Sequence, residues 1–337
     1  MGGGSTAGAT RRSERGVALL MVLWIFMVLT VLVGEFSRAM RDDAVATRNL
    51  AEEIQARGVA MAGMNIAIYR TLRAREQNTE RTPPGEADDG EPEVWLPDGS
   101  WHEGTYGGGS YAVRIVDEGG KIPLNRADEA LLRRVFDRLG LDTDAQEELV
   151  DAILDWRDAD TLHRLHGAEE EYYLSLPEPY RPKDGAFDAV EELLQVRGIG
   201  RDLFYGTRPA GLGRDGGLAI PLKEIFSVFN RSATINIRTA PPGVLRVLLD
   251  AEQEEVEEII AARDEDPDSA LSLIRAKVGD QQLARRLVDR TASTVAIDAR
   301  AVMALGNVQA RVGAVVDVSE DGDGFHVARW IDRLPAL

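Results

Sequence analysis

Hydrophobic residues are concentrated in one uninterrupted stretch near the start of this 337-residue chain. From Val17 to Val33 every residue is apolar except Thr30, and none is charged. As a helix these residues rise roughly 25 Å, just short of the hydrocarbon thickness of a bilayer, so flanking residues must complete the span. The pattern predicts a single membrane-spanning helix.

The residues on either side of this stretch predict its orientation. Arg11, Arg12 and Arg15 precede it with only Glu14 opposing them, which places the N-terminus in the cytoplasm and the chain beyond about residue 36 on the outside. A cleaved secretory signal would be shorter and would end in small residues, whereas the helical pattern here continues without a break. We therefore expect the bulk of the chain to be exported and to stay attached.

Apolar residues keep a roughly helical spacing well past the predicted membrane segment. Leu50, Ile54, Met61 and Ile66 follow this spacing, and no proline occurs before Pro83. One helix reaching to about residue 77 would be on the order of 90 Å long. The sequence therefore predicts a stem that holds the rest of the chain away from the membrane.

The pattern then changes from strands to helices and back to strands. After a linker rich in proline, glycine and acidic residues (82–92), "SYAVRIVDEGG" predicts a strand. Residues 131–154 predict two helices, and "FDAVEELLQVRGIG" predicts another that ends at a glycine turn. Near the end, "NVQARVGAVVDVS" and "GFHVARWIDR" predict a hairpin. This order predicts an α+β fold whose sheet is interrupted by a large helical insertion.

The insertion contains two segments of similar sequence, an internal repeat. "IPLNRADEALLRRVF" followed by "AILDWRDAD" resembles "INIRTAPPGVLRVLL" followed by "EIIAARDED". Both have a leucine-rich helix and a second helix that ends in Arg-Asp-x-Asp. Two related helical units, similar to sterile-alpha-motif or helix-hairpin-helix modules, are therefore expected.

Charge limits the classes of partner. The formal net charge is −18, whereas affinity for nucleic acid requires clustered Lys and Arg. The turn "VRGIG" (196–200) does match the glycine hairpin of helix-hairpin-helix proteins, so a membrane-anchored protein that handles DNA is the alternative function. However, eleven acidic residues against two arginines between Leu141 and Glu171 would repel a duplex. We expect protein or cation partners and no nucleic acid.

No catalytic motif accompanies the four histidines, and the chain has no cysteine. A calcium-dependent hydrolase therefore lacks a visible nucleophile or base, and we expect no enzymatic activity. Dense carboxylates are the ligands that Ca²⁺ prefers, and one loop brings six of them near one another; a solvated acidic surface is the other interpretation. The candidate ligands are Asp155, Asp158, Asp160, Glu169, Glu170 and Glu171.

The basic leader ending in Gly16, followed by the apolar run, resembles a type IV prepilin signal. The resemblance implies that prepilin peptidase cuts between Gly16 and Val17 on the cytoplasmic side. Pilins usually carry Glu at the fifth mature position, where this chain has Met21. In the pilin family that carboxylate is thought to pair with the amino terminus of a neighbour, a pairing that a subunit with nothing above it does not need.

Together these residues resemble the protein K family, the large minor pseudopilins of type II secretion systems. The resemblance rests on the leader and on "DEGGKIPLN", "DAILDWRDAD", "GAEEEYYLSLPEPYRPKDGAFDAVEELLQVRGI" and "INIRTAPPGVLRVLL". It implies an inner-membrane protein with a periplasmic body, placed at the pseudopilus tip, where it starts assembly and supports export. It also implies other minor pseudopilins as partners, calcium in the helical region and no catalytic activity.

The pattern and the resemblance together predict six segments. They are a cleaved leader (1–16), a transmembrane and stem helix (17–78), the first part of a pilin-like body (79–121), two helical units (122–233 and 234–290) and C-terminal strands of the body (291–337).

Overall fold

The protein is described from a computed structural model, which covers residues 10–79, 95–207, 220–290, 293–303, 309–318 and 324–332. Side chains are described within these ranges except at residues 10–16, 75–79, 264 and 267. Part of the predicted leader (1–9) and the predicted linker (82–92) lie outside the described residues.

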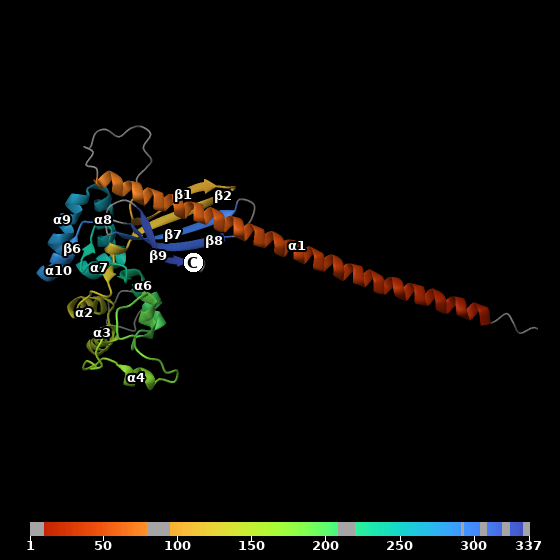
Figure 1. Cartoon of the computed structure of the whole chain (residues 1–337), viewed down its shortest axis with the longest axis horizontal. Helices are drawn as coiled ribbons and strands as arrows, with labels where there is room; N and C mark the ends of the chain where they lie inside the picture. Colours follow the sequence, from red (N-terminus) through yellow and green to blue (C-terminus); the bar gives the residue numbers. More distant parts are fainter. Residues whose placement is uncertain are drawn as a thin grey trace, which may run out of the picture.

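A single long helix, α1 (Thr10–Thr79), carries both the apolar stretch and the predicted stem. Its residues from Val17 to Val33 are all exposed, and its mean hydropathy and length are sufficient for a membrane span. At its other end Val59, Met64 and Ile68 are buried against the sheet. The helix therefore projects far beyond the body, with its apolar half free (Figure 1), as the pattern predicts.

The body has one five-stranded antiparallel sheet with strand order β1-β2-β7-β8-β9. Alternate residues of β2, β7 and β8 face α1 and form a core with it, because side chains on one face of a strand are two residues apart. The predicted strand and the predicted C-terminal hairpin are confirmed as β2 and as β8 with β9. The strands are β1 (Asp98–Tyr106), β2 (Gly109–Asp117), β7 (Thr294–Met303), β8 (Gln309–Val318) and β9 (Phe325–Ile331).

The helical region is an insertion between two neighbouring strands of this sheet. β2 and β7 pair directly, with Ile115 opposite Ile297, although about 180 residues separate them in sequence. The insertion has its own hydrophobic core, distinct from the core between α1 and the sheet. Its elements are η1 (Glu118–Gly120), β3 (Ile122–Pro123), α2 (Glu129–Arg138), α3 (Thr143–Arg157), α4 (Glu170–Leu174), η2 (Val190–Gln195), α5 (Arg201–Tyr205), α6 (Leu222–Ile225), β4 (Phe226–Ser227), β5 (Ile235–Asn236), α7 (Pro242–Leu249), α8 (Gln253–Glu265), α9 (Pro267–Lys277), α10 (Gln281–Arg286) and β6 (Leu287–Val288).

The internal repeat corresponds to two helix pairs, α2 with α3 and α7 with α8. In the first pair Arg157 donates to the carbonyl oxygens of Leu124 and Ala127 (2.7 and 2.6 Å). In the second, Arg263 donates to the carbonyl oxygen of Ala240 (3.2 Å). Ala127 and Ala240 each stand two residues before the first helix of their pair. The arginine of Arg-Asp-x-Asp therefore plays the same part in both pairs: it satisfies carbonyl groups at the start of the preceding helix.

Asp117, at the end of β2, fixes the sheet to the second helix pair. Its buried carboxylate accepts hydrogen bonds from the Asn236 side-chain amide (2.7 Å), the Thr239 hydroxyl (2.8 Å) and the backbone N–H of Gly119 (2.8 Å). A buried carboxylate needs such donors because desolvation without them is costly. The insertion is thus attached by a polar network as well as by its covalent ends.

One predicted helix is much shorter than expected. Within 187–200 the structure has only the 3-10 helix η2, because the backbone is already extended at Val196. The Glu192 side chain accepts from the backbone N–H groups of Asp188 and Ala189 at the start of η2. The predicted glycine turn follows, with Gly198 at φ +81°. A side chain at Gly198 would meet Leu149 at 2.7 Å, so both the backbone and the packing require glycine here.

Candidate cation site

The candidate site begins on α3, which places acidic residues one helical turn apart. Asp151 and Asp155 lie on the same helix face, four residues from each other. Both are buried, Asp155 completely. Asp155 accepts from the backbone N–H of Arg164 (3.0 Å), and Asp151 accepts from that of His166 (3.1 Å). These two carboxylates fix the loop that follows the helix.

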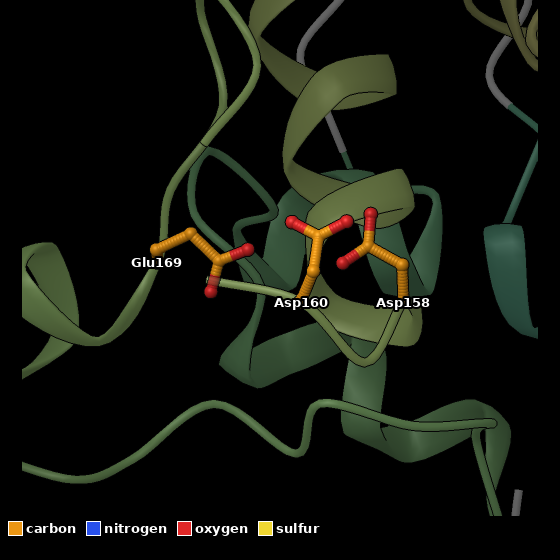
Figure 2. A group of neighbouring side chains, drawn as sticks. All are labelled: Asp158, Asp160 and Glu169. Carbon is orange, nitrogen blue, oxygen red and sulfur yellow. The ribbon is translucent and has the colours of Figure 1, made fainter. Parts of the chain in front are cut away.

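Where α3 ends, three carboxylates converge. Asp158 is the C-terminal cap of α3, Asp160 follows it in the loop, and Glu169 is the N-terminal cap of α4. One oxygen from each lies within 4.8 Å of the other two. Figure 2 shows Asp160 between the other two residues, with Glu169 and Asp158 turned toward it from opposite sides. We call Asp158, Asp160 and Glu169 the acidic cluster.

Two oxygens of the acidic cluster are buried without a hydrogen-bond donor among the described residues: Oδ1 of Asp158 and Oε1 of Glu169. Burial, followed by the negative charge of Asp155, raises the pKa of Glu169 to about 7. Burial, followed by the charge of Asp160, also raises the pKa of Asp158. Without a counter-charge the cluster is therefore electrostatically strained. A divalent cation with a preference for oxygen would supply that charge, so the donor set fits Ca²⁺.

The six candidate ligands separate into groups. The structure brings Asp158, Asp160 and Glu169 together. Asp155 is near enough for its charge to raise the pKa of Glu169, and burial raises its own pKa, but its carboxylate accepts from the loop backbone. Glu170 pairs instead with Arg181 (3.1 Å), and Glu171 is exposed on α4, so neither belongs to the acidic cluster.

Sequence reasoning missed Asp151 and Gly167, which shape the site without joining the acidic cluster. Gly167 is buried, and a Cβ there would lie 1.9 Å from Oδ2 of Asp155. Only glycine therefore allows the loop to pass over this carboxylate. The spacing of Asp151 from Asp155 was a usable signal, but the approach of Gly167 to α3 depends on the path of the loop.

The glycine turn at Val196–Gly200 lies beside α3. Arg197 donates through Nε to Glu148 (2.9 Å) and through Nη1 to the carbonyl oxygen of Gly167 (3.1 Å). Its guanidinium therefore has protein partners on both sides, and it helps to fix the loop that bears Gly167.

The fold and this site define a class: an α+β body on a stem helix with an exposed apolar half, with a helical insertion that bears a convergent acidic cluster. Residues 114–210 match the family model described as "Type II secretion system (T2SS), protein K". The acidic cluster lies within the matched residues.

Comparisons with individual proteins agree with this match over part of the chain. Type II secretion system protein K from Pectobacterium carotovorum subsp. carotovorum is 26% identical over 59% of this chain and 62% of its own length. Its counterpart from Pseudomonas aeruginosa is 27% identical over 75% of this chain and 73% of its own length. The resemblance to protein K of type II secretion systems is thus confirmed.

A solved structure shows the same fold. A chain in the crystal structure of the GspK-GspI-GspJ complex from the type 2 secretion system of enterotoxigenic Escherichia coli superposes with a TM-score of 0.56 and 16% identity. The superposition covers 88% of this chain and 99% of that chain. Over the superposed part, this chain therefore has the same overall fold as that chain.

Proposed function

We propose that this chain is a minor pseudopilin of a type II secretion system, anchored in the inner membrane with its N-terminus in the cytoplasm and its body in the periplasm. The observation that carries the proposal is α1: residues from Val17 to Val33 are exposed and, apart from Thr30, apolar, while the buried residues between Val59 and Ile68 pack on the sheet. Such a helix can be held both in a bilayer and among the helices of other subunits. The matches to protein K support the same role.

We further propose a position at the tip, where the protein starts assembly, has other minor pseudopilins as partners and has no enzymatic activity. Met21 is 62% exposed on α1 and supplies no carboxylate for a subunit above it. The insertion adds a bulky helical region beside the sheet (Figure 1), which stacked subunits would leave little room for. A complex that contains GspI and GspJ holds the chain of similar fold.

Calcium binding is part of the proposal. Asp158, Asp160 and Glu169 would hold the cation, with the charge of Asp155 nearby, because two of their buried oxygens have no donor among the described residues. The cation would supply positive charge between the end of α3 and the start of α4. It would therefore stabilise the loop and take no part in a reaction.

Mass spectrometry of the mature N-terminus tests the proposed function. In cells with an active prepilin peptidase, we expect the chain to begin at Val17. Gly16→Arg should leave the precursor intact, since a bulky charge replaces the small residue at the cut. Gly8→Arg, within the leader but away from the cut, is the control and should be processed normally. A wild-type protein that keeps residues 1–16 would refute the pseudopilin assignment.

Crosslinking tests the position at the tip. The chain has no cysteine, so single cysteines introduced between Val17 and Arg38 report only their own neighbours. A tip subunit should crosslink to a few companion pseudopilins and not to itself. Met21→Glu should not improve assembly, because a carboxylate without a partner in an apolar environment is costly. Abundant, regularly spaced self-crosslinks would instead identify a repeating shaft subunit.

A further inference from the structure

The face of the sheet that is turned away from α1 carries three arginines and a tryptophan at neighbouring positions. Trp101 stands opposite Arg114, and Arg114 stands opposite Asp298. In the adjacent row, Arg300 stands opposite Arg311. The residues that alternate with these positions in β2, β7 and β8 pack toward α1, so these side chains point the opposite way. We call Trp101, Arg114, Asp298, Arg300 and Arg311 the arginine face.

Trp101 holds two of the guanidinium groups in place. Cζ of Arg300 lies 4.3 Å from the centroid of the Trp101 ring, and Cζ of Arg114 lies 5.0 Å from it. Both distances are within the range of cation–π contacts. Ala112 points to the same face from the strand between Trp101 and Arg300 and is only 7% exposed, so longer side chains lie over it. Arg300 is therefore partly fixed in advance, which reduces the entropy lost when it binds a partner.

The ion pairs of the arginine face leave one guanidinium without a carboxylate. Asp298 accepts from Nε (2.8 Å) and Nη2 (2.6 Å) of Arg311, and it also pairs with Arg114 (3.1 Å). Arg300 is exposed and forms no ion pair with any residue that the structure describes. The next acid on this face, Glu103, stands two strands from Arg300, roughly 10 Å between backbones. Three arginines thus share one carboxylate, and the charge of Arg300 is available to a partner.

The geometry of Arg300 favours a carboxylate as its ligand. A guanidinium that is stacked on a ring uses its flat face for that contact and keeps the N–H groups in its plane for hydrogen bonds. This fork matches the two oxygens of Asp or Glu, and such charge-assisted pairs are about twice as strong as neutral ones. The net charge of the whole chain is −18, but repulsion from distant acids is screened beyond about 8–10 Å. The local charge therefore decides what binds here.

The surroundings of Arg300 favour a protein as the source of the carboxylate. Trp and Arg are the residue types that most often dominate the binding energy of protein–protein interfaces. Val302, two residues along β7 on the same face, is 36% exposed, and the exposed residues Thr105 and Ser110 continue its row. Together they give the site a mixed apolar and polar rim, as protein interfaces have. Nucleic acid or an anionic lipid surface would require a larger basic cluster, because many phosphates are contacted together.

We propose that Arg300, stacked on Trp101, binds a carboxylate in an acidic segment of another protein, and that the arginine face is the docking surface for this segment. The proposal rests on the proposed function in that the partner is sought among the proteins that meet the periplasmic body. It concerns the face opposite α1, so it is separate from the contacts that α1 makes with companion subunits.

Carbodiimide coupling in cell envelopes that contain the secretion system tests the proposal, because this reagent joins an amine directly to a carboxylate. Arg300→Lys in the full-length chain places an amine in the site. We expect this amine to form an amide with one Asp or Glu of one other protein, identified by peptide mass spectrometry. Arg231→Lys, at a side chain that is 80% exposed and outside the arginine face, is the control for random coupling. Coupling no more frequent than in this control, spread over many proteins, or confined to acids of this chain would refute the proposal.

Charge reversal tests whether the coupled acid is the ligand of Arg300. Thr105→Cys, labelled with benzophenone maleimide, reports a partner beside the arginine face, since the chain has no other cysteine. Adding Arg300→Glu should reduce the adduct about tenfold or more, because a charge-assisted pair is replaced by two like charges. Replacing the partner's coupled acid by lysine should restore the adduct, and Trp101→Phe should retain more of it than Trp101→Ala. An adduct that Arg300→Glu leaves undiminished, or an adduct to lipid, would overturn the assignment.

Two further measurements separate docking from assembly and from folding. Ile54→Cys on α1, 64% exposed and labelled in the same way, measures assembly with companion subunits. An adduct at Ile54 with none at Thr105 would refute the docking surface and leave the proposed function intact, whereas no adduct at either position would count against both. Arg300→Ala should unfold at nearly the wild-type temperature, since substitutions of exposed side chains change stability little. A clear fall would show that the stacked guanidinium serves the fold, and would overturn its docking role.

Discussion

The two helix pairs of the insertion share a motif and use it differently. Both end in Arg-Asp-x-Asp, and in both the arginine bonds carbonyl groups before the first helix. After the first pair the chain makes a loop that returns Glu169 to Asp158 and Asp160. After the second, Asp266 immediately caps α9, accepting from the backbone N–H of Ser269.

The acids of the two motifs therefore lie in different electrostatic surroundings, although Asp158 directly follows its arginine and Asp266 is the last residue of its motif. Burial raises the pKa of Asp158, whereas hydrogen bonds from the Ser269 side chain and backbone lower the pKa of Asp266. A carboxylate that caps a helix has its donors already. The comparison shows that the motif encodes the arginine contact, and that the following loop decides whether its acids can hold a cation.

The largest expected loss of stability comes from replacing the arginine that the two helix pairs share. Arg157→Ala should lower the free energy of unfolding by about 3 kcal/mol, because it leaves two carbonyl groups without their charged donor. Arg263→Ala should be destabilising in the same way. Urea unfolding measures both. As a control, Arg133→Ala on the surface of α2 should cost less than about 0.5 kcal/mol. If Arg157→Ala were as mild as this control, the shared role of the arginines would be wrong.

The effect of calcium on stability should differ between variants of the two helix pairs. At a free concentration one hundred times the dissociation constant, calcium should add about 2.7 kcal/mol to stability, and chelation should lower the melting temperature by several degrees. Asp158→Ala with Asp160→Ala should abolish this difference. Asp266→Ala should keep it, although loss of the cap costs about 1 kcal/mol. Equal melting temperatures with and without calcium in the wild type would remove the proposed site.

Adding one methyl group at Gly167 tests how closely the loop after α3 approaches this helix. Gly167→Ala should cost about 2 kcal/mol and weaken calcium binding, because the new Cβ would overlap the buried Asp155 carboxylate. Gly279→Ala is the matched control in the second half of the insertion, where a Cβ would meet no atom within 4 Å. Thermal unfolding should show a shift for the first variant alone.

The smallest effect is a dependence on pH in calcium-free protein. Burial raises the pKa of Glu169 from 4.5 to about 7, so the folded state binds its proton more tightly than the unfolded state. The associated stability is fully present below pH 4.5 and is lost as the pH rises through 7. Between pH 8 and pH 6 the melting temperature should therefore rise on acidification. Glu169→Gln should reduce this slope, and an identical slope in that variant would exclude Glu169 as its source.

Hydrophobic patterning by itself determined the stem helix, the alternating strands and the helical character of the insertion. Apolar periodicity predicts these elements because burying one face of a helix or strand is the main favourable contribution to folding. The density of carboxylates, and not the apolar pattern, gave six candidate ligands, among them Asp158, Asp160 and Glu169. The apolar pattern did not indicate that η2 would be so short, since the backbone becomes extended at Val196, two residues before the turn at Gly198.

The tertiary structure decided which acids meet. Asp155, Glu170 and Glu171 are carboxylates like those of the acidic cluster. However, Asp155 accepts from the backbone N–H of Arg164, and Glu170 forms an ion pair with Arg181. The pairing of β2 with β7 likewise joins residues about 180 positions apart. Carboxylates are recognisable from sequence, whereas their convergence depends on how a loop returns to a helix end, and that path is set by contacts distant in the chain, such as those of Gly167 with Asp155 and Arg197.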